Sequence, residues 1–281
     1  MELRPSTLYL VGTPIGNLGD LSPRAAEVLG GVSFIAAEDT RVTGKLLRHL
    51  GLSTPMVSYH EHNRLRRAGE ILPRLLAGET CALCTDAGMP AISDPGDDLV
   101  GRCHEAGIAV ESVPGPSAVT TALALSGLPA GRFCFEGFLS TGSGSRAAHL
   151  EAIRREPRTL VFYEAPHKLL RTLEDLYGAL GDRDVALCRE MTKLHEQTVR
   201  TTLSGALALA RLTEPRGEYV LVVAGWAEPA PEVGPQAVEQ ALREALAQGL
   251  TGRDAVRQAA ERLGLPRNQV YAQFVQLTRE P

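Results

Sequence analysis

The chain has 281 residues, of which 44% are hydrophobic and 22% charged, and its formal net charge is −4. These values are typical of a soluble globular protein long enough for two domains, and they exclude a surface that is basic overall. The apolar runs are strand-sized and fall short of the roughly 20 residues of a membrane helix, and the apolar stretch near the N-terminus is too short for a signal peptide. Since the five cysteines fit a reducing compartment, the sequence predicts a cytoplasmic protein.

Residues 1–128 alternate strand and helix patterns and are predicted to form a first α/β domain. The expected strands cover 7–12, 32–37, 80–85 and 109–113, and the expected helices cover 22–31, 43–50 and 64–77. Such alternation favours a mostly parallel sheet covered by helices, with the ligand site at the carboxyl ends of the strands.

A domain boundary is expected near residues 126–132, and residues 129–228 are predicted to form a second α/β domain. In chain order its expected elements are a strand at 133–137, a Gly/Ser-rich loop at 138–146, a helix at 147–155, a strand at 159–163, a helix at 167–180, strands at 184–188 and 196–203, a helix to 212 and a strand at 218–224. A Pro-rich linker at 227–236 ends this domain.

Residues 236–281 are predicted to form a small helical module. Three short helices are expected at 237–247, 254–263 and 267–277, with Gly249 and Gly264 just beyond helix ends, and this spacing resembles a helix-turn-helix unit. Because the charge of this module is nearly balanced, it fits a packing or dimerisation appendage as well as a direct contact with nucleic acid.

Three Gly/Pro-rich loops each follow a predicted strand: LYLVGTPIGNLGD (8–20), LCTDAGMPAISDPG (83–96) and VESVPGPSAVTTA (110–122). Together they predict one composite small-molecule site. In the middle loop, Asp86 can accept hydrogen bonds from a ribose or balance a cationic ligand, although an Asp that only forms the turn fits too. Asp94 is expected to cap a helix at 95–106. The first loop is not a dinucleotide fingerprint, because its glycines are too widely spaced.

Further polar clusters follow other predicted strands. AEDTR (37–41) either faces the cleft or forms an exposed start of a helix. SYHEHNRLRR (58–67) contains a His-x-His pair that lacks the further ligands of a metal site, so a solvated loop is expected, and its arginines either contact phosphates or form a solvated helix face. Cys81 and Cys84 point to opposite faces of a strand and are expected in the core.

Two segments of the second domain also lie at strand ends, YEAPHK (163–168) and REMTKLHEQ (189–197). Tyr163 could stack on a base, and Lys193 or His195 could steer a phosphate or accept a proton. Both segments also fit plain structural roles, with Pro166 in the first turn of a helix.

These motifs, in order across residues 8–224, resemble the tetrapyrrole methylase superfamily and, within it, the ribosomal RNA small subunit methyltransferase I family. The tail resembles the helical C-terminal extension of that family, and only the FLSTGSGSR loop departs from the family pattern. The resemblance implies two α/β domains of tetrapyrrole-methylase type with a cofactor cleft between them, plus a small C-terminal helical module, and a homodimer. It also implies S-adenosylmethionine as methyl donor and the ribose 2′-hydroxyl of a cytidine in 16S rRNA, within the 30S subunit, as acceptor.

The sequence offers candidate residues for each task, and the resemblance implies those that bind the cofactor. Its cofactor-binding residues are Pro14, Asp86, Ala87, Gly88, Met89, Ser117, Ala118, Tyr163, Glu164 and Ala165. Glu38, Asp39 and Lys193 are candidates for orienting and deprotonating the hydroxyl, and no metal is expected. Candidate RNA contacts are Arg41, Arg64, Arg66 and Arg67. Two alternatives stay open: a methyltransferase of the same superfamily that acts on a tetrapyrrole or a protein, and a non-enzymatic RNA-binding assembly factor.

Overall fold

The computed structural model describes residues 2–228 and 234–278, and the chain divides into two compact units, Met1–Trp226 and Ala227–Pro281. The predicted linker at 227–236 lies partly outside the described residues. Of the helices in the described part of the chain, none is both long and apolar enough to cross a membrane.

The first sheet has five strands, all parallel, in the order β3-β2-β4-β1-β5. The strands are β1 (Thr7–Val11), β2 (Phe34–Ala37), β3 (Met56–Ser58), β4 (Thr80–Cys84) and β5 (Ala109–Val113). The predicted parallel sheet is therefore confirmed. Strand β3 was missed because three half-buried residues at the edge of a sheet are too few to show an alternating pattern.

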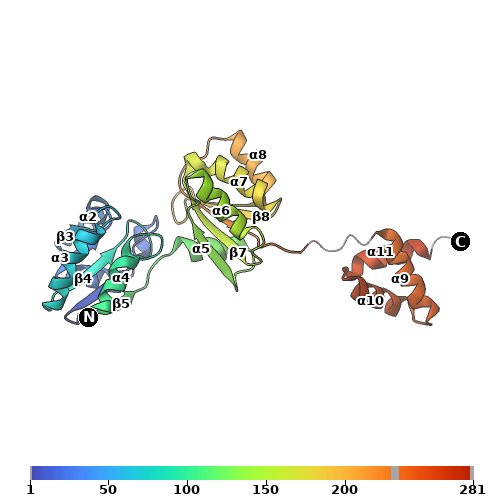
Figure 1. The fold of residues 1–281 in the computed structure, drawn as a ribbon, viewed down its shortest axis with the longest axis horizontal. Coiled ribbons are helices and arrows are strands. Elements are labelled where there is room, and N and C mark those ends of the chain that lie inside the picture. Colours follow the sequence, from blue (N-terminus) through green and yellow to red (C-terminus); the bar gives the residue numbers. More distant parts are fainter. Residues whose placement is uncertain (1, 229–233, 279–281) are drawn as a thin grey trace. The chain divides into compact units, whose positions relative to one another are not determined.

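Helices cover both faces of this sheet (Figure 1). One face packs against α1 (Pro23–Gly31) and α2 (Thr40–His49), and the other against α3 (Arg64–Leu76) and α4 (Gly96–Glu105). A short 3₁₀ helix, η1 (Leu18–Asp20), precedes α1. Cys81 and Cys84 are buried in β4, as predicted.

The start of α4 differs from the prediction. The helix begins at Gly96 with Pro95 at the N-cap position, so Asp94 is not the N-cap residue. Its carboxylate instead accepts backbone N–H groups on both sides of it: Ala91 at 2.9 Å, Ile92 at 3.1 Å and Gly96 at 2.9 Å. Asp94 therefore fixes the preceding loop as well as the start of the helix.

The second sheet is mixed and has the order β6-β7-β10-β8-β9. Only β6 and β7 pair in parallel, and the other neighbours are antiparallel. Its strands are β6 (Phe133–Gly137), β7 (Thr159–Glu164), β8 (Asp184–Arg189), β9 (Gln197–Thr202) and β10 (Tyr219–Val223). Helices α6 (Ser143–Ile153), α7 (Leu169–Leu180) and α8 (Leu203–Leu212) cover one face, and α5 (Ala118–Ser126), which follows the first sheet in the chain, covers the other (Figure 1).

Two helices of the predicted second α/β domain start at residues other than those predicted. Helix α6 begins within the predicted Gly/Ser-rich loop, because Arg146 is buried and donates to Asp175, to Thr172 and to the Ser140 carbonyl. These tertiary contacts outweigh the poor helix propensity of the Ser/Gly segment. The helix predicted from residue 167 begins as a 3₁₀ turn, η2 (Pro166–Lys168), and continues as α7.

In its described residues, the second unit has three helices around a core of its own, in which Leu242 and Val270 are fully buried. The helices are α9 (Pro235–Ala247), α10 (Gly252–Leu263) and α11 (Arg267–Leu277), so α11 matches its predicted bounds. Gly264 ends α10 in the left-handed conformation.

Candidate active site

The three Gly/Pro-rich loops meet through their backbones at the carboxyl ends of β1, β4 and β5. Gly12 N–H donates to the Val113 carbonyl at 3.0 Å, and Thr13 and Gly88 exchange two backbone hydrogen bonds of 2.9 and 3.1 Å. Gly88 has a φ of +90°, which favours glycine. At Gly115 the backbones approach so closely that a Cβ atom would lie 2.8 Å from the Gly12 carbonyl oxygen. The loops therefore form one rigid framework.

Replacing Gly115 with alanine should lower the thermal unfolding midpoint by roughly 2–10 °C, since forcing a methyl group between two backbones costs about 1–3 kcal/mol. Differential scanning calorimetry would measure the shift. Gly101→Ala is the matched control, because a Cβ at this position in α4 meets nothing within 4 Å. An unchanged midpoint in Gly115→Ala would contradict the rigid framework.

A pocket of about 540 Å³ lies against these loops, and its walls come from both sheets of the first unit. Its volume is in the usual range for a small-molecule site. Nine of the ten predicted cofactor-binding residues line it: Asp86, Ala87, Gly88, Met89, Ser117, Ala118, Tyr163, Glu164 and Ala165. We call it the first pocket. The tenth, Pro14, lines a neighbouring hollow of about 320 Å³ that also includes Asp86, Ala87 and Lys193.

Carboxylates dominate the charge of the first pocket. Neither lysine nor arginine is among its lining residues in the described part of the chain, whereas six acids are: Glu38, Asp86, Asp94, Glu164, Glu190 and Glu218. Glu190 and Glu218 share the ammonium of Lys193, each at 2.9 Å. The remaining acids give the pocket a negative potential, which favours a cationic ligand.

Glu38 and Asp86 lie together at the ends of β2 and β4. One carboxylate oxygen of Glu38, Oε2, accepts the Thr85 hydroxyl at 2.6 Å and the Asp86 N–H at 3.3 Å. No hydrogen bond to the other oxygen, Oε1, is found among the described residues. Burial, followed by the negative charge of Glu38, raises the pKa of Asp86. A positive ligand charge would relieve this repulsion.

Asp39 lies beside this pair but points to Arg41. Its carboxylate accepts the Arg41 guanidinium at 2.6 Å and the Arg41 N–H at 2.8 Å, and so caps α2. The side-chain hydrogen bond from Arg41 is the main reason that the pKa of Asp39 falls to about 2. A carboxylate held in this way is a weak proton acceptor, so its contacts favour a structural role.

The Asp39–Arg41 pair gives a pH-dependent prediction. Because the pKa of Asp39 is lowered in the folded state, the pair should stabilise the protein above the unfolded-state value near 3.9 and lose this effect as the pH falls towards 2. NMR of the Asp39 carboxyl carbon should show almost no titration down to pH 3 in the wild type. In Arg41→Ala the midpoint should return towards 3.8. A wild-type midpoint near 3.8 would contradict this prediction.

Lys193 has two carboxylate partners, Glu190 and Glu218. Burial lowers its pKa, but the hydrogen bonds to Glu218 and Glu190 outweigh burial, so the pKa is raised overall. The ammonium therefore stays protonated at neutral pH and can donate but not accept a proton. Of the three acid–base candidates, the contacts favour Glu38.

Aromatic rings form the wall of the first pocket on the side of the second sheet. Tyr163 packs edge-on against Phe135, with ring centroids 5.0 Å apart, and lies 5.6 Å from Phe138. Phe138 is 56% exposed although it is large and apolar, and it lines the pocket. This wall offers a surface for a flat ligand group.

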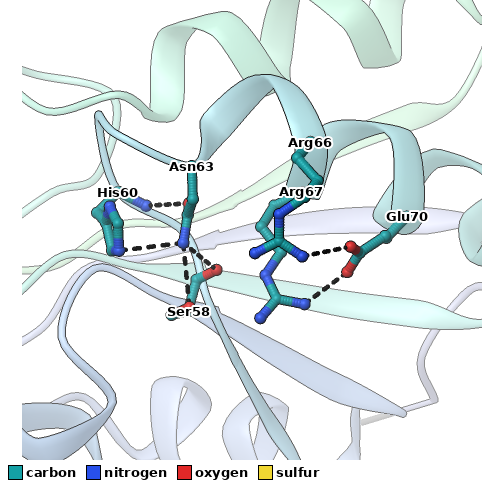
Figure 2. Close-up of polar contacts among 6 residues, drawn as sticks. All are labelled: Ser58, His60, Asn63, Arg66, Arg67 and Glu70. Carbon is teal, nitrogen blue, oxygen red and sulfur yellow. Dashed lines mark hydrogen bonds and ion pairs between the residues drawn. The ribbon is translucent and has the colours of Figure 1, made fainter.

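The predicted RNA-contacting arginines differ in their surroundings. Arg41 is exposed beside Asp39, and Arg64 lines a further pocket while pairing with Glu61 at 3.3 Å. Arg66 and Arg67 share one carboxylate, that of Glu70, as Figure 2 shows. In the predicted solvated loop, Glu61 and His62 are exposed, whereas His60 is half-buried and hydrogen-bonded to Asn63.

Sequence reasoning missed several pocket residues. Glu190 directly follows β8 and Glu218 directly precedes β10, and the pairing of these two strands places them together. The Glu218 N–H donates to Glu190 at 2.9 Å. The positive φ of Glu190, +49°, gives no signal in the sequence. Phe138 also lines the pocket, although its segment was predicted only as a Gly/Ser-rich loop. Ser93, by contrast, belongs to the loop 83–96 that was predicted to form part of the site.

Comparisons with known proteins agree with this architecture. Residues 7–207 match the family model described as Tetrapyrrole (Corrin/Porphyrin) Methylases, and residues 232–278 match the RsmI C-terminal HTH domain. A solved structure of uroporphyrin-III C-methyl transferase from Thermus thermophilus, complexed with S-adenyl homocysteine, has a TM-score of 0.56 at 22% identity, covering 78% of this chain and 97% of that one. The fold is thus that of the tetrapyrrole methylases.

Two curated relatives are similar along almost their whole length. Ribosomal RNA small subunit methyltransferase I from Synechocystis sp. is 50% identical, over 96% of this chain and 98% of the relative. The protein of that name from Pseudomonas aeruginosa is 44% identical, over 96% and 97%. The chain belongs to the ribosomal RNA small subunit methyltransferase I family, a family of methyltransferases, and the resemblance seen in its motifs is confirmed.

Proposed function

We propose that this protein transfers the methyl group of S-adenosylmethionine to the ribose 2′-hydroxyl of a cytidine in 16S rRNA of the small ribosomal subunit. The observation that carries the proposal is a pocket framed by three strand-end loops, lined by six carboxylates and, in the described part of the chain, by neither lysine nor arginine. The names of the relatives support rRNA as the substrate.

The first pocket fits S-adenosylmethionine by its chemistry. The ligand has a sulfonium and an ammonium against a single carboxylate, so its net positive charge suits Asp86 and its acidic neighbours. Its adenine suits the aromatic wall at Tyr163 and Phe138. When bound, it supplies a methyl group activated by the sulfonium for in-line displacement.

The protein's own residues have the task of holding the acceptor hydroxyl and taking up its proton. Glu38 suits this task because Oε2 is fixed by Thr85 and Asp86 while Oε1 stays available. A ribose hydroxyl is a weak acid, so a positioned base and alignment must act together. Lys193, as a fixed cation, stabilises Glu190 and Glu218 and leaves Glu38 as the base.

The decisive experiment is methylation of 30S particles with radiolabelled S-adenosylmethionine, followed by mapping of the labelled nucleotide. The expected product is a single cytidine methylated at its ribose. Label on a base, on protein or on an added tetrapyrrole would support the alternative of another methyltransferase of this fold. Binding of RNA without any transfer would support a non-enzymatic assembly factor.

The proposal includes a cytoplasmic homodimer and a contribution of the second unit to RNA binding or dimerisation. A chain that ends at residue 234 should keep its affinity for S-adenosylmethionine, since every residue lining the first pocket lies in the first unit. Sedimentation and RNA binding of the truncated chain separate the two roles. If neither changes, both roles are excluded.

A further inference from the structure

A second pocket, of about 560 Å³, adjoins the first one. Glu38, Ser93 and Asp94 line both pockets and so form their common wall. The other side of the second pocket comes from the loop before α3 and the start of α4, and includes His60, Glu61, His62, Arg64, Pro95 and Asp97. Glu38, the proposed base, thus separates the two pockets.

The charge of the second pocket disfavours a phosphate. Four carboxylates line it, those of Glu38, Glu61, Asp94 and Asp97, and the arginine among the lining residues, Arg64, is paired with Glu61 at 3.3 Å. A neutral group rich in hydrogen-bond donors fits this wall better than a phosphate does. Ribose hydroxyls and the exocyclic amino group of a base are such donors.

His60 is held in one orientation by Asn63 (Figure 2). The Asn63 oxygen accepts the backbone N–H of His60 at 2.9 Å, which fixes which way the amide points. The amide nitrogen then donates to the Ser58 hydroxyl at 3.1 Å and faces His60 Nε2 at 3.1 Å. Because the amide nitrogen is a donor only, Nε2 must accept, and the proton of the neutral ring lies on Nδ1.

The Nδ1–H group has no hydrogen-bond partner among the described residues, and it is buried. A buried donor without a hydrogen-bond partner lowers the stability of the folded protein. The hydrogen bond from Asn63 nevertheless keeps the proton on Nδ1, where this partner is missing. His60 is one of the residues that line the second pocket. An acceptor atom of a bound molecule, reaching Nδ1 after a small shift of the wall, would satisfy it.

We infer that the second pocket seats the nucleoside of the acceptor nucleotide, and that His60 donates a hydrogen bond from Nδ1 to it while Asn63 positions His60. This inference rests on the proposed function. It places the ribose next to Glu38, between the nucleoside pocket and the methyl-donor pocket. The phosphates stay outside, near the exposed arginines.

The test compares side chains that keep or remove a donor at the position of Nδ1. His60→Asn places an amide nitrogen near that position, whereas His60→Gln and His60→Ala do not. With 30S particles as acceptor, His60→Gln and His60→Ala should raise KM about tenfold, and His60→Asn should stay within about threefold of the wild type. The Kd of S-adenosylmethionine should not change in any of them. His104→Ala, an exposed histidine of α4, is the matched control.

Asn63 has a readout of its own. In Asn63→Asp the carboxylate can only accept a hydrogen bond, so Nε2 must carry a proton, and NMR of ¹⁵N-labelled histidine should show His60 protonated at Nε2 in place of the wild-type ring protonated at Nδ1 alone.

The dependence of KM on ionic strength distinguishes a contact to the nucleoside from a contact to a phosphate. The increase in KM caused by His60→Ala should be the same at low and high salt, whereas loss of a phosphate contact makes KM less dependent on salt.

Three results would overturn the inference: an unchanged KM in His60→Ala, an equal loss in His60→Asn and His60→Gln, or a reduced salt dependence in His60→Ala.

Failure of the proposed function can be told apart from failure of this inference, because the wild type itself then transfers no methyl group to 30S particles. In that case, titration of ¹⁵N-labelled wild type with cytidine decides. Saturable shifts of His60 but not of His104 support a nucleoside site, and their absence overturns it.

Discussion

Glu38→Gln is expected to lower the rate constant of methyl transfer by about a hundredfold or more while changing the Kd of S-adenosylmethionine little. A positioned general base typically contributes 10²–10⁴-fold, and the glutamine keeps an oxygen for the Thr85 hydroxyl. Single-turnover transfer to 30S particles measures the rate constant, and calorimetry measures Kd.

Asp39→Asn is the matched comparison for Glu38→Gln. Asp39 adjoins Glu38 in the chain, but its carboxylate is bound to Arg41. We expect this variant to keep the transfer rate within several-fold of the wild type. If Asp39→Asn lost as much activity as Glu38→Gln, the assignment of the base to Glu38 would be wrong. If neither lost activity, alignment alone would account for the rate.

Asp86→Asn is expected to weaken the binding of S-adenosylmethionine by roughly tenfold or more, because it removes a charge that faces a cationic ligand. The fold should survive, since the asparagine oxygen can still accept the Asp39 N–H, a bond of 3.1 Å in the wild type. Calorimetry measures the change in Kd, and repeating it at a second salt concentration shows how much of that change is electrostatic, because salt screens charge interactions.

The control for Asp86→Asn is Asp20→Asn, an exposed acid in η1 that lies outside the pocket walls. It changes the net charge equally and should leave Kd unaltered. Equal affinities of the Asp86→Asn and Asp20→Asn proteins would remove Asp86 from the site. An equal loss in both would indicate a long-range charge effect in place of a local contact.

Much of the fold and of the first pocket could be predicted from the sequence, because both depend on local patterns. The strand-end loops around Gly12, Asp86 and Gly115 are recognisable as contiguous motifs, and the structure brings them together at the pocket. Strand β3 and the start of α6 could not be predicted in this way. A three-residue strand has no period, and α6 begins where it does because Arg146 reaches Asp175, 29 residues away.

The second pocket could not be predicted for a similar reason. His60 and His62 invite a test for metal ligands, and in the described residues no group of three His, Cys, Asp or Glu side chains could hold a metal ion. What distinguishes His60 is its hydrogen bond to Asn63 and its place in the same pocket as Glu38, which follows β2, whereas His60 follows β3. Such a relation depends on register and side-chain orientation, which sequence spacing does not determine.

Helix α5 makes ligand binding and folding of the second sheet thermodynamically linked. Its N-cap residue Ser117 and its first residue Ala118 line the first pocket, while Val119, Ala122 and Leu123 belong to the core beneath the second sheet. A ligand that holds the start of the helix adds its binding free energy to that core, by RT ln(1 + [L]/Kd). Hydrogen exchange of buried amides in β8 and β10, far along the chain from the three loops, should therefore slow as the ligand concentration rises, by a factor of up to 1 + [L]/Kd.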